Sequence, residues 1–352
     1  MSSSQDGSHV RQTDLFVSGL GGYHTYRIPA LLVTAAGTIL AFCEGRRYSR
    51  SDSGDIDIVL RRSTDSGETW SEMQVVADAG PDVFGNPCPV QDRTTGTLWL
   101  PINWNLADRP ENMIVRGEAP RGVWLLRSDD DGVTWSAPAE ITAQVKPEGW
   151  RWYATGPGHG IQLASGRLLI PCDFSVGSPD PERRDFGSHI IYSDDHGASW
   201  QVGGAILGQV NECMAVQLSD GAVYLNMRAY HGRNRSAVAW SHDEGQTWSD
   251  VAFDDALIEP ICQAGLLGLA DDRVIFSNPA STQRERLTVR ISADRCRTWS
   301  AGLVLHAVPS AYSYLALAPD WQVCCLYERG DAHPYERITL ARFHVATAGI
   351  AL

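Results

Sequence analysis

The stretch Ser63-Thr64-Asp65-Ser66-Gly67-Glu68-Thr69-Trp70 carries the pattern that decides the fold, Ser-x-Asp-x-Gly-x-Thr/Ser-Trp. The same pattern returns in four further segments: Ser128 to Trp135, Ser193 to Trp200, Ser241 to Trp248 and Ser292 to Trp299. The last copy has Cys296 in place of the glycine. Spaced copies of one pattern predict a fold built from similar units, because no single unit can bury its own core.

Each repeat has the composition of a tight turn. Asp and Ser side chains accept hydrogen bonds from nearby backbone N–H groups, and glycine permits a left-handed backbone at the bend. Strand-like runs flank the repeats at residues 56–60, 123–126 and 190–192, so each repeat is predicted to lie at the tip of a β-hairpin. The repeats begin 48 to 65 residues apart, which is about one four-stranded unit for each repeat.

Composition places the chain among globular proteins. It has 352 residues, of which 43% are hydrophobic and 20% are charged, and these values are ordinary for such a protein. All-β chains of this length often form one unit. We therefore expect residues 1–10, which are polar and rich in serine, to be a disordered tail and residues 11–352 to form one domain.

The cellular compartment of the protein is predicted from its apolar runs and its cysteines. No apolar run reaches the roughly 18 residues of a membrane span, and residues 1–10 lack the apolar stretch of a signal peptide. The sequence predicts a cytoplasmic protein without a membrane span, with secretion after removal of a leader as the alternative. The eight cysteines form no C-x-x-C pair, and most lie in apolar runs, which predicts buried thiols in a reducing compartment.

The charge of the chain limits its partners. A net charge of −13 and a pI of about 5.2 argue against nucleic acid as a partner. An anionic ligand stays open, because a cleft can hold a local charge opposite to the net charge. We expect no metal or other cofactor. The run Asp129-Asp130-Asp131 is interpreted as turn residues, with a weak calcium site as the alternative.

A second motif, Tyr26-Arg27-Ile28-Pro29, places an arginine in an apolar strand, where it is costly unless paired. Arg27 is either paired with a structural carboxylate or aimed into a cavity that binds an anion. Together with the repeats, the motif resembles the Phe/Tyr-Arg-Ile-Pro motif and the Asp boxes of the sialidase superfamily. The resemblance extends from about Leu15 to Phe343. It implies an all-β, six-bladed β-propeller with its Asp boxes on the outer rim, away from the active site.

The resemblance also implies three arginines that bind the carboxylate of sialic acid. A guanidinium offers paired donors that match a carboxylate, whereas a lysine would hold charge without orientation. Arg27 is the first candidate. Arg228, at the end of the strand-like run 225–227, is the second. Arg284 is the third, with Arg290 as its competitor.

An acid/base aspartate is implied on a loop shortly after the first arginine. Asp52 has the expected position relative to the pair Ile56-Asp57, and Asp55 is its competitor. A polar loop of this composition is otherwise ordinary turn chemistry. Arg46 resembles the additional arginine near the O4 side of the sugar.

The nucleophile implied by the resemblance is a tyrosine. The anomeric carbon of sialic acid carries a carboxylate, so a neutral phenol avoids bringing like charges together. A free tyrosine has a pKa of about 10 and needs a base. Tyr312 is the candidate nucleophile, Tyr314 the alternative, and Glu212 the candidate base.

Other segments also resemble sialidase loops. His159 lies in a Gly/Pro-rich loop that is predicted to line the site without direct chemistry. Trp150, Trp152 and Tyr153 either stack on substrate or pack in the core. The run Cys172-Asp173-Phe174 stands where animal-type enzymes carry tyrosines that face the glycerol tail, which leaves a related acid sugar such as Kdn or Kdo open.

The sequence therefore predicts a retaining exo-α-sialidase that acts on sialylated glycoconjugates through a covalent tyrosyl intermediate. One alternative is a hydrolase for Kdn or Kdo. The other is a non-catalytic Asp-box propeller that binds glycans or proteins. We also expect the segments 322–327 and 336–343 to be strands of a last unit that both ends of the chain complete.

Overall fold

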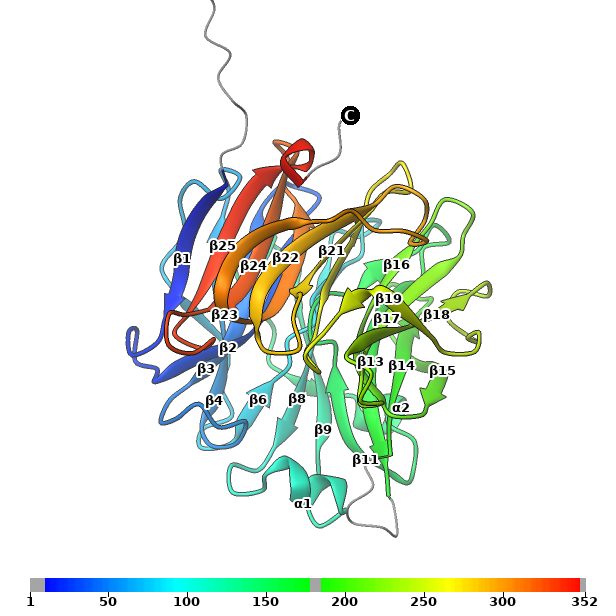
Figure 1. Cartoon of the computed structure of the whole chain (residues 1–352). Coiled ribbons are helices and arrows are strands. Elements are labelled where there is room, and N and C mark those ends of the chain that lie inside the picture. The colour runs from blue at the N-terminus through cyan, green and yellow to red at the C-terminus, as the bar shows by residue number, and fades with distance from the viewer. Residues whose placement is uncertain (1–9, 178–184, 349–352) are drawn as a thin grey trace, which may run out of the picture.

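The computed structural model describes residues 10–177 and 185–348, and these are mostly β-strands (Figure 1). The helices of the described residues are short: α1 (Glu111–Val115), α2 (Thr142–Val145) and the 3-10 turn η1 (Val345–Ala348). None of these helices has the length and apolar character to cross a membrane. The predicted tail 1–10 lies outside the described residues, except for Val10.

The strands of the described residues form four sheets. The first sheet contains β2 (Thr25–Val33), β3 (Ile39–Arg46), β4 (Ile56–Ser63), β5 (Gln74–Ala77), β6 (Val83–Gly85), β7 (Val90–Gln91), β8 (Leu98–Asn105), β9 (Gly122–Ser128) and β10 (Ala139–Glu140). The second contains β11 (Trp150–Thr155), β12 (Ile161–Gln162), β13 (Leu168–Val176), β14 (Phe186–Ser193) and β15 (Gln201–Leu207). The third contains β16 (Val210–Gln217), β17 (Val223–Ala229), β18 (Arg235–Ser241) and β19 (Ala252–Ile258).

The fourth sheet joins the two ends of the chain. It contains β20 (Gly265–Gly268), β21 (Val274–Pro279), β22 (Glu285–Ser292), β23 (Leu303–Leu317), β24 (Gln322–Arg329), β25 (Arg337–His344) and β1 (Arg11–Val17). The first strand, β1, pairs antiparallel with the last, β25, and the two lie side by side in Figure 1. The expected closure by both ends of the chain is confirmed, and it gives β25 a partner on its outer side.

Strand β23 is 15 residues long and belongs to two groups of strands. Its first part, as far as Pro309, pairs with β22, and its second part, from Ser310, pairs with β24. One continuous strand therefore connects the group β20–β22 to the group that contains both ends of the chain.

The Asp boxes form closed turns. In the first box, Ser63 Oγ donates to Asp65 at 2.8 Å and accepts from the Gly67 N–H at 2.8 Å. Asp65 in turn accepts from the N–H of Thr69 at 2.9 Å. In the fifth box Cys296 makes the equivalent N–H bond, to Ser292 at 2.9 Å, with a φ of 62°. The turn prediction is confirmed, and Cys296 adopts a left-handed conformation that glycine adopts more readily.

Buried apolar side chains fill the space between neighbouring sheets in several clusters. All eight cysteines are buried free thiols, as predicted. The run Asp129–Asp131 takes part in turns and strand ends, where Asp130 accepts from Thr134 and Asp131 accepts from Thr38.

Candidate active site

One cavity of about 330 Å³ gathers all the residues that the sequence predicts for the site. Those that line it are Arg27, Arg46, Asp52, Glu212, Arg228, Arg284 and Tyr312. None of the competitors Asp55, Arg290 and Tyr314 is among the described residues that line the cavity. The Asp-box residues also lie elsewhere in the described part of the chain.

Breaks in strand register aim side chains into this cavity. They lie between Arg27 and Ala30 in β2, between Trp150 and Tyr153 in β11, between Val210 and Cys213 in β16, and between Ser310 and Ser313 in β23. Trp152, Glu212 and Tyr312 lie inside three of these breaks, and Arg27 begins the fourth. A bulge interrupts regular alternation and redirects a side chain, which is why bulges occur beside active sites.

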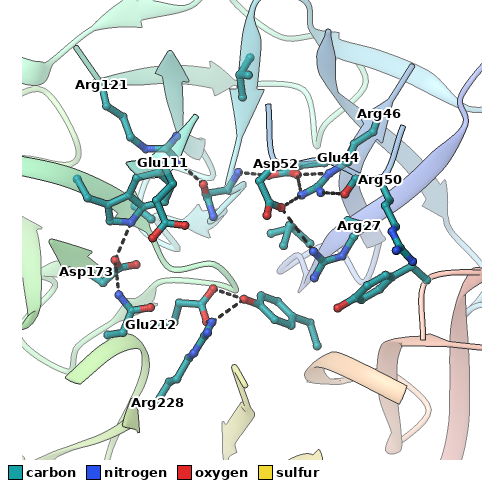
Figure 2. Close-up of a pocket in the computed structure, with 18 of the residues that line it drawn as sticks. Arg27, Glu44, Arg46, Arg50, Asp52, Glu111, Arg121, Asp173, Glu212 and Arg228 are labelled. Carbon is teal, nitrogen blue, oxygen red and sulfur yellow. Dashed lines mark hydrogen bonds and ion pairs between the residues drawn. The ribbon is translucent and has the colours of Figure 1, made fainter. Parts of the chain in front are cut away.

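Tyr312 and Glu212 form a short hydrogen-bonded pair in the cavity. The phenol donates to Glu212 Oε1 at 2.5 Å, and Arg228 Nη1 donates to Glu212 Oε2 at 2.7 Å and to the phenol oxygen at 3.1 Å (Figure 2). Burial raises the pKa of Tyr312, and Glu212 raises it further, whereas Arg228 and Arg284 lower it. The phenol therefore has a base at its proton and cations at its oxygen.

Arg27 fits both interpretations, because it has a carboxylate partner and also lines the cavity. Glu328, which is 0% exposed, accepts from Arg27 Nε at 3.0 Å and from Nη2 at 3.3 Å. The same carboxylate accepts from the N–H of Ile28 at 2.9 Å and from the N–H of Tyr312 at 3.2 Å. Ile28 has a φ of 53°, which is strained for a β-branched residue. Glu328 thus fixes the first arginine relative to the tyrosine.

Arg284 directly precedes β22 and also lines the cavity. Its Nη1 donates to Tyr335 Oη at 2.7 Å, and its Nη2 donates to the carbonyl of Ile261 at 3.3 Å. Its guanidinium lies 5.6 Å from the ring centroid of Tyr312, and that of Arg27 lies 5.3 Å from the same ring. The three predicted arginines therefore converge around one aromatic ring.

Asp52 lies at the mouth of the cavity, where its side chain is 65% exposed. Its Oδ1 is 2.6 Å from Arg46 Nη2 and 3.5 Å from Arg27 Nη1. Partial burial acts to raise the pKa of Asp52, but Arg46 and Arg27 outweigh it and hold the pKa below its usual value. Arg46 is itself held by Glu44 at 2.6 Å.

The wall opposite Asp52 is polar (Figure 2). Arg121 Nη2 donates to Asn86 Oδ1 at 2.6 Å, and its guanidinium lies 3.9 Å from the ring centroid of Trp152. Burial lowers the pKa of Arg121 to about 10. Trp152 and Asn211 both donate to Asp173 Oδ1, at 3.0 and 2.9 Å, and burial raises the pKa of Asp173.

Sequence reasoning missed several residues of this site, among them Glu44, Arg50, Glu111, Arg121, Tyr230 and Tyr335 in the lining, and Glu328 behind Arg27. A charged residue within or beside an apolar strand was the available signal for Glu44, Arg121 and Glu328. For Glu111, on the short helix α1, the sequence offers no signal of this kind.

The aromatic residues before the glycine-rich loop have different places. Trp152 lines the cavity, whereas Trp150 stacks on Phe174 with ring centroids 3.7 Å apart. Tyr153 is 0% exposed. His159 is buried, its Nδ1 lies 3.1 Å from the carbonyl of Gly160, and burial lowers its pKa.

Comparisons with known proteins agree on the class of fold. Residues 37–325 match the family described as BNR repeat-like domain. Among solved structures, the Hadza microbial sialidase Hz136 superposes with a TM-score of 0.86 at 30% identity, over 96% of this chain and 69% of that chain. A leech intramolecular trans-sialidase superposes with a TM-score of 0.79 at 18% identity, over 96% of this chain and 71% of that chain, which shows a shared fold.

Curated relatives narrow the class. An exo-alpha-sialidase of Aspergillus fumigatus is 35% identical over 82% of this chain and 72% of its own length. Sialidase-3 of Bos taurus is 30% identical over 91% of this chain and 89% of its own length. A sialidase of Micromonospora viridifaciens is 34% identical over 94% of this chain, which spans 54% of that relative's length. The chain belongs to the sialidase family of glycoside hydrolases.

Proposed function

We propose that this chain is a retaining exo-α-sialidase that removes terminal sialic acid from glycoconjugates and uses no cofactor. The observation that carries the proposal is the hydrogen bond from Tyr312 to Glu212, in a cavity that also contains three arginines and a carboxylate at its mouth. A module that only binds glycans has no need for a base at the proton of a buried phenol.

Substrate binding begins with the sugar carboxylate. Arg27, Arg228 and Arg284 supply the planar donors, and their backbone and side-chain partners fix the orientation of each guanidinium. In this binding mode the anomeric carbon lies near the Tyr312 phenol and the glycosidic oxygen lies near Asp52.

In the first step the Tyr312 oxygen forms a bond to the anomeric carbon and its proton moves to Glu212. The bond from that carbon to the leaving oxygen breaks, and Asp52 gives its proton to the leaving oxygen. In the second step water forms a bond to the same carbon and gives a proton to Asp52, the bond from that carbon to the Tyr312 oxygen breaks, and Glu212 returns the proton to the phenol. Two inversions give retention.

Asp52 needs a proton at the start, although Arg46 and Arg27 hold its pKa below the usual value. A bound sugar carboxylate places a negative charge against Arg27 and weakens this effect. Substrate binding therefore raises the pKa of Asp52 toward the value that a general acid requires.

We further propose that the sheets represent six four-stranded blades of one propeller formed by residues 11–352. In this count the first and fourth sheets each contain two blades, and the two blades of the fourth sheet meet within β23. The second and third sheets are one blade each. The pairing of β1 with β25 and the solved sialidase neighbours support this count.

A second candidate substrate is a related acid sugar with a hydroxyl in place of the acylamino group, such as Kdn. The segment of Asp173 favours it, because it replaces the tyrosines that face the glycerol tail in animal-type enzymes with a polar wall that Arg121 and Glu111 share.

The test is hydrolysis of paired fluorogenic glycosides of N-acetylneuraminic acid, Kdn and Kdo. We expect release from the first or second substrate, at least about 100-fold slower in Asp52→Ala and in Tyr312→Phe. The anomer released first, read by NMR, should have the configuration of the substrate. Folded protein that releases none of the three sugars would contradict the enzyme, and a Tyr312→Phe variant with most of its turnover would contradict the mechanism.

A further inference from the structure

Glu259 is a buried carboxylate at the end of the third sheet, directly after β19, and it is 1% exposed. Its Oε1 accepts from the N–H of Ala229 at 3.4 Å, and its Oε2 accepts from the N–H of Cys262 at 2.8 Å. Ala229 follows Arg228 in β17. Glu259 itself is not among the described residues that line the cavity.

The segment held by Glu259 is strained. Ile261 has a φ of 55°, which is unfavourable for a β-branched residue and is maintained only where the surroundings impose it. The bond from the next residue, Cys262, to the carboxylate is one such restraint. The carbonyl of Ile261 accepts from Arg284 Nη2 at 3.3 Å. The strained residue therefore presents the acceptor that orients the third arginine.

The first arginine has the same arrangement. Ile28 has a φ of 53°, follows Arg27 and donates its N–H to the buried carboxylate of Glu328 at 2.9 Å. At both places a buried glutamate holds an isoleucine in a left-handed conformation beside an arginine of the cavity. The difference is that Glu328 also contacts its arginine directly, whereas Glu259 acts through backbone groups.

We propose that Glu259 is a positioning residue that fixes the separation of Arg228 and Arg284, and thereby the affinity for the substrate carboxylate. The inference rests on the proposed function, in which these two arginines bind that carboxylate. One oxygen of Glu259 holds the strand that carries Arg228, and the other holds the loop that supports Arg284.

Both oxygens of the side chain must be acceptors for this role. Burial raises the pKa of Glu259 to about 7, although the N–H groups of Cys262 and Ala229 and the charge of Arg228 act to lower it, so both oxygens are acceptors only above about pH 7 and the variants are compared there. Glutamine has the same shape but one acceptor only, so its NH2 group would face one of the two backbone donors. One buried N–H then loses its partner.

The first experiment compares Glu259→Gln with the unchanged enzyme. We expect KM for a fluorogenic N-acetylneuraminide and Kd for the unsaturated analogue 2-deoxy-2,3-didehydro-N-acetylneuraminic acid to rise about tenfold, with kcat within about threefold. Arg228 and Arg284 remain in place but lose their fixed separation. A general loss of folded protein would instead lower the active fraction and leave KM unchanged.

Asp92→Asn is the matched control. Asp92 is 0% exposed and also accepts from a backbone N–H, that of Thr94 at 2.8 Å, but it is not among the described residues that line the cavity. We expect this variant to lower Tm and leave KM and Kd unchanged. An equal rise of KM in Asp92→Asn would reduce the effect at Glu259 to general destabilisation.

Ile261→Gly provides a second background, because glycine adopts the left-handed conformation without strain. In this background Glu259→Gln should raise KM by a smaller factor, because the loop at residue 261 is no longer strained and needs less restraint from the carboxylate. If KM and Kd for Glu259→Gln stay within about twofold of their parents in both backgrounds, the proposal is wrong. Failure of the unchanged protein to hydrolyse or bind any of these compounds would instead contradict the proposed function.

Discussion

At the scale of single residues, two carboxylates of the site have opposite surroundings. Glu328 is enclosed and accepts from Arg27, Ile28 and Tyr312, whereas Asp52 is mostly exposed at the mouth. The enclosed carboxylate is suited to hold geometry that does not change in the reaction. The exposed one is suited to exchange a proton with the leaving group and then with water.

Replacing Glu328 by glutamine should destabilise the protein by about 3 to 5 kcal/mol, because it removes the buried counter-charge of Arg27 and leaves only the exposed Asp52. Urea unfolding followed by tryptophan fluorescence measures this change. Glu68→Gln is the control, since Glu68 also pairs with two arginines, Arg342 and Arg11, but is 53% exposed. Its expected cost is much smaller than that of Glu328→Gln, because solvent screens an exposed ion pair. Equal costs would show that burial of Glu328 contributes nothing.

Most residues of the site were predicted through the family resemblance, and Arg27 alone also had a local signal of its own. Arg27 was recognisable because it is a charged residue in an apolar strand, but its partner Glu328 was missed. Glu328 lies 301 positions away, and only the folded chain brings the two together. Tyr312 and Tyr314 could not be separated by alternation, because residues two apart in a strand face the same side. The register break between Ser310 and Ser313 separates them.

At the scale of elements, the Asp boxes are small acceptor sites with a predictable pH dependence. Hydrogen bonds from Thr69 lower the pKa of Asp65 to about 2, and those from Thr134 lower the pKa of Asp130 to about 2. The usual value for an unfolded chain is about 3.9. The stabilisation is therefore present above about pH 4 and is lost as the pH falls toward 2.

Asp65→Asn should lower Tm at pH 6, and the difference from the unchanged protein should shrink as the pH falls from about 4 to 2. Thermal unfolding at several pH values measures both effects. Asp108→Asn is the control, because Asp108 is 75% exposed and lies outside the boxes. A difference for Asp65→Asn that stays constant down to pH 2 would contradict a stabilising charge in the box.

The strands beside the boxes were predictable because hairpin tips and apolar runs are local features. The division of β23 between two groups of strands had one local signal, Pro309, at the point where its partner changes, but a single proline does not show that the chain continues as one strand of 15 residues. The division lies where pairing with β22 ends and pairing with β24 begins.

At the scale of the whole molecule, β1 completes the sheet that begins at the other end of the chain. Phe16 is 2% exposed, and Asp14 accepts from Thr339 at 2.5 Å and from Arg329 at 3.1 Å. The sheet therefore depends on a strand that is remote in sequence from its partner.

Removal of residues 1–18 should lower Tm by about 10 °C or more and promote aggregation, because the edge of β25 and the surface under Phe16 become exposed. Differential scanning calorimetry and light scattering measure these effects. A synthetic peptide of residues 10–18, added in excess, should restore part of the lost Tm, whereas a scrambled peptide should not. A truncated chain with unchanged Tm would show that β1 is dispensable.

The pairing of β1 with β25 also has a consequence for synthesis on the ribosome. Arg27 and β1 emerge early, but Tyr312, Glu328 and β25 follow about 300 residues later. At about 5 to 20 residues per second, the nascent chain spends roughly 15 to 60 seconds with β1 unpaired and Arg27 without its buried partner Glu328. The site can form only after β23, β24 and β25 have been made, and chaperones have that interval in which to protect the unfinished sheet.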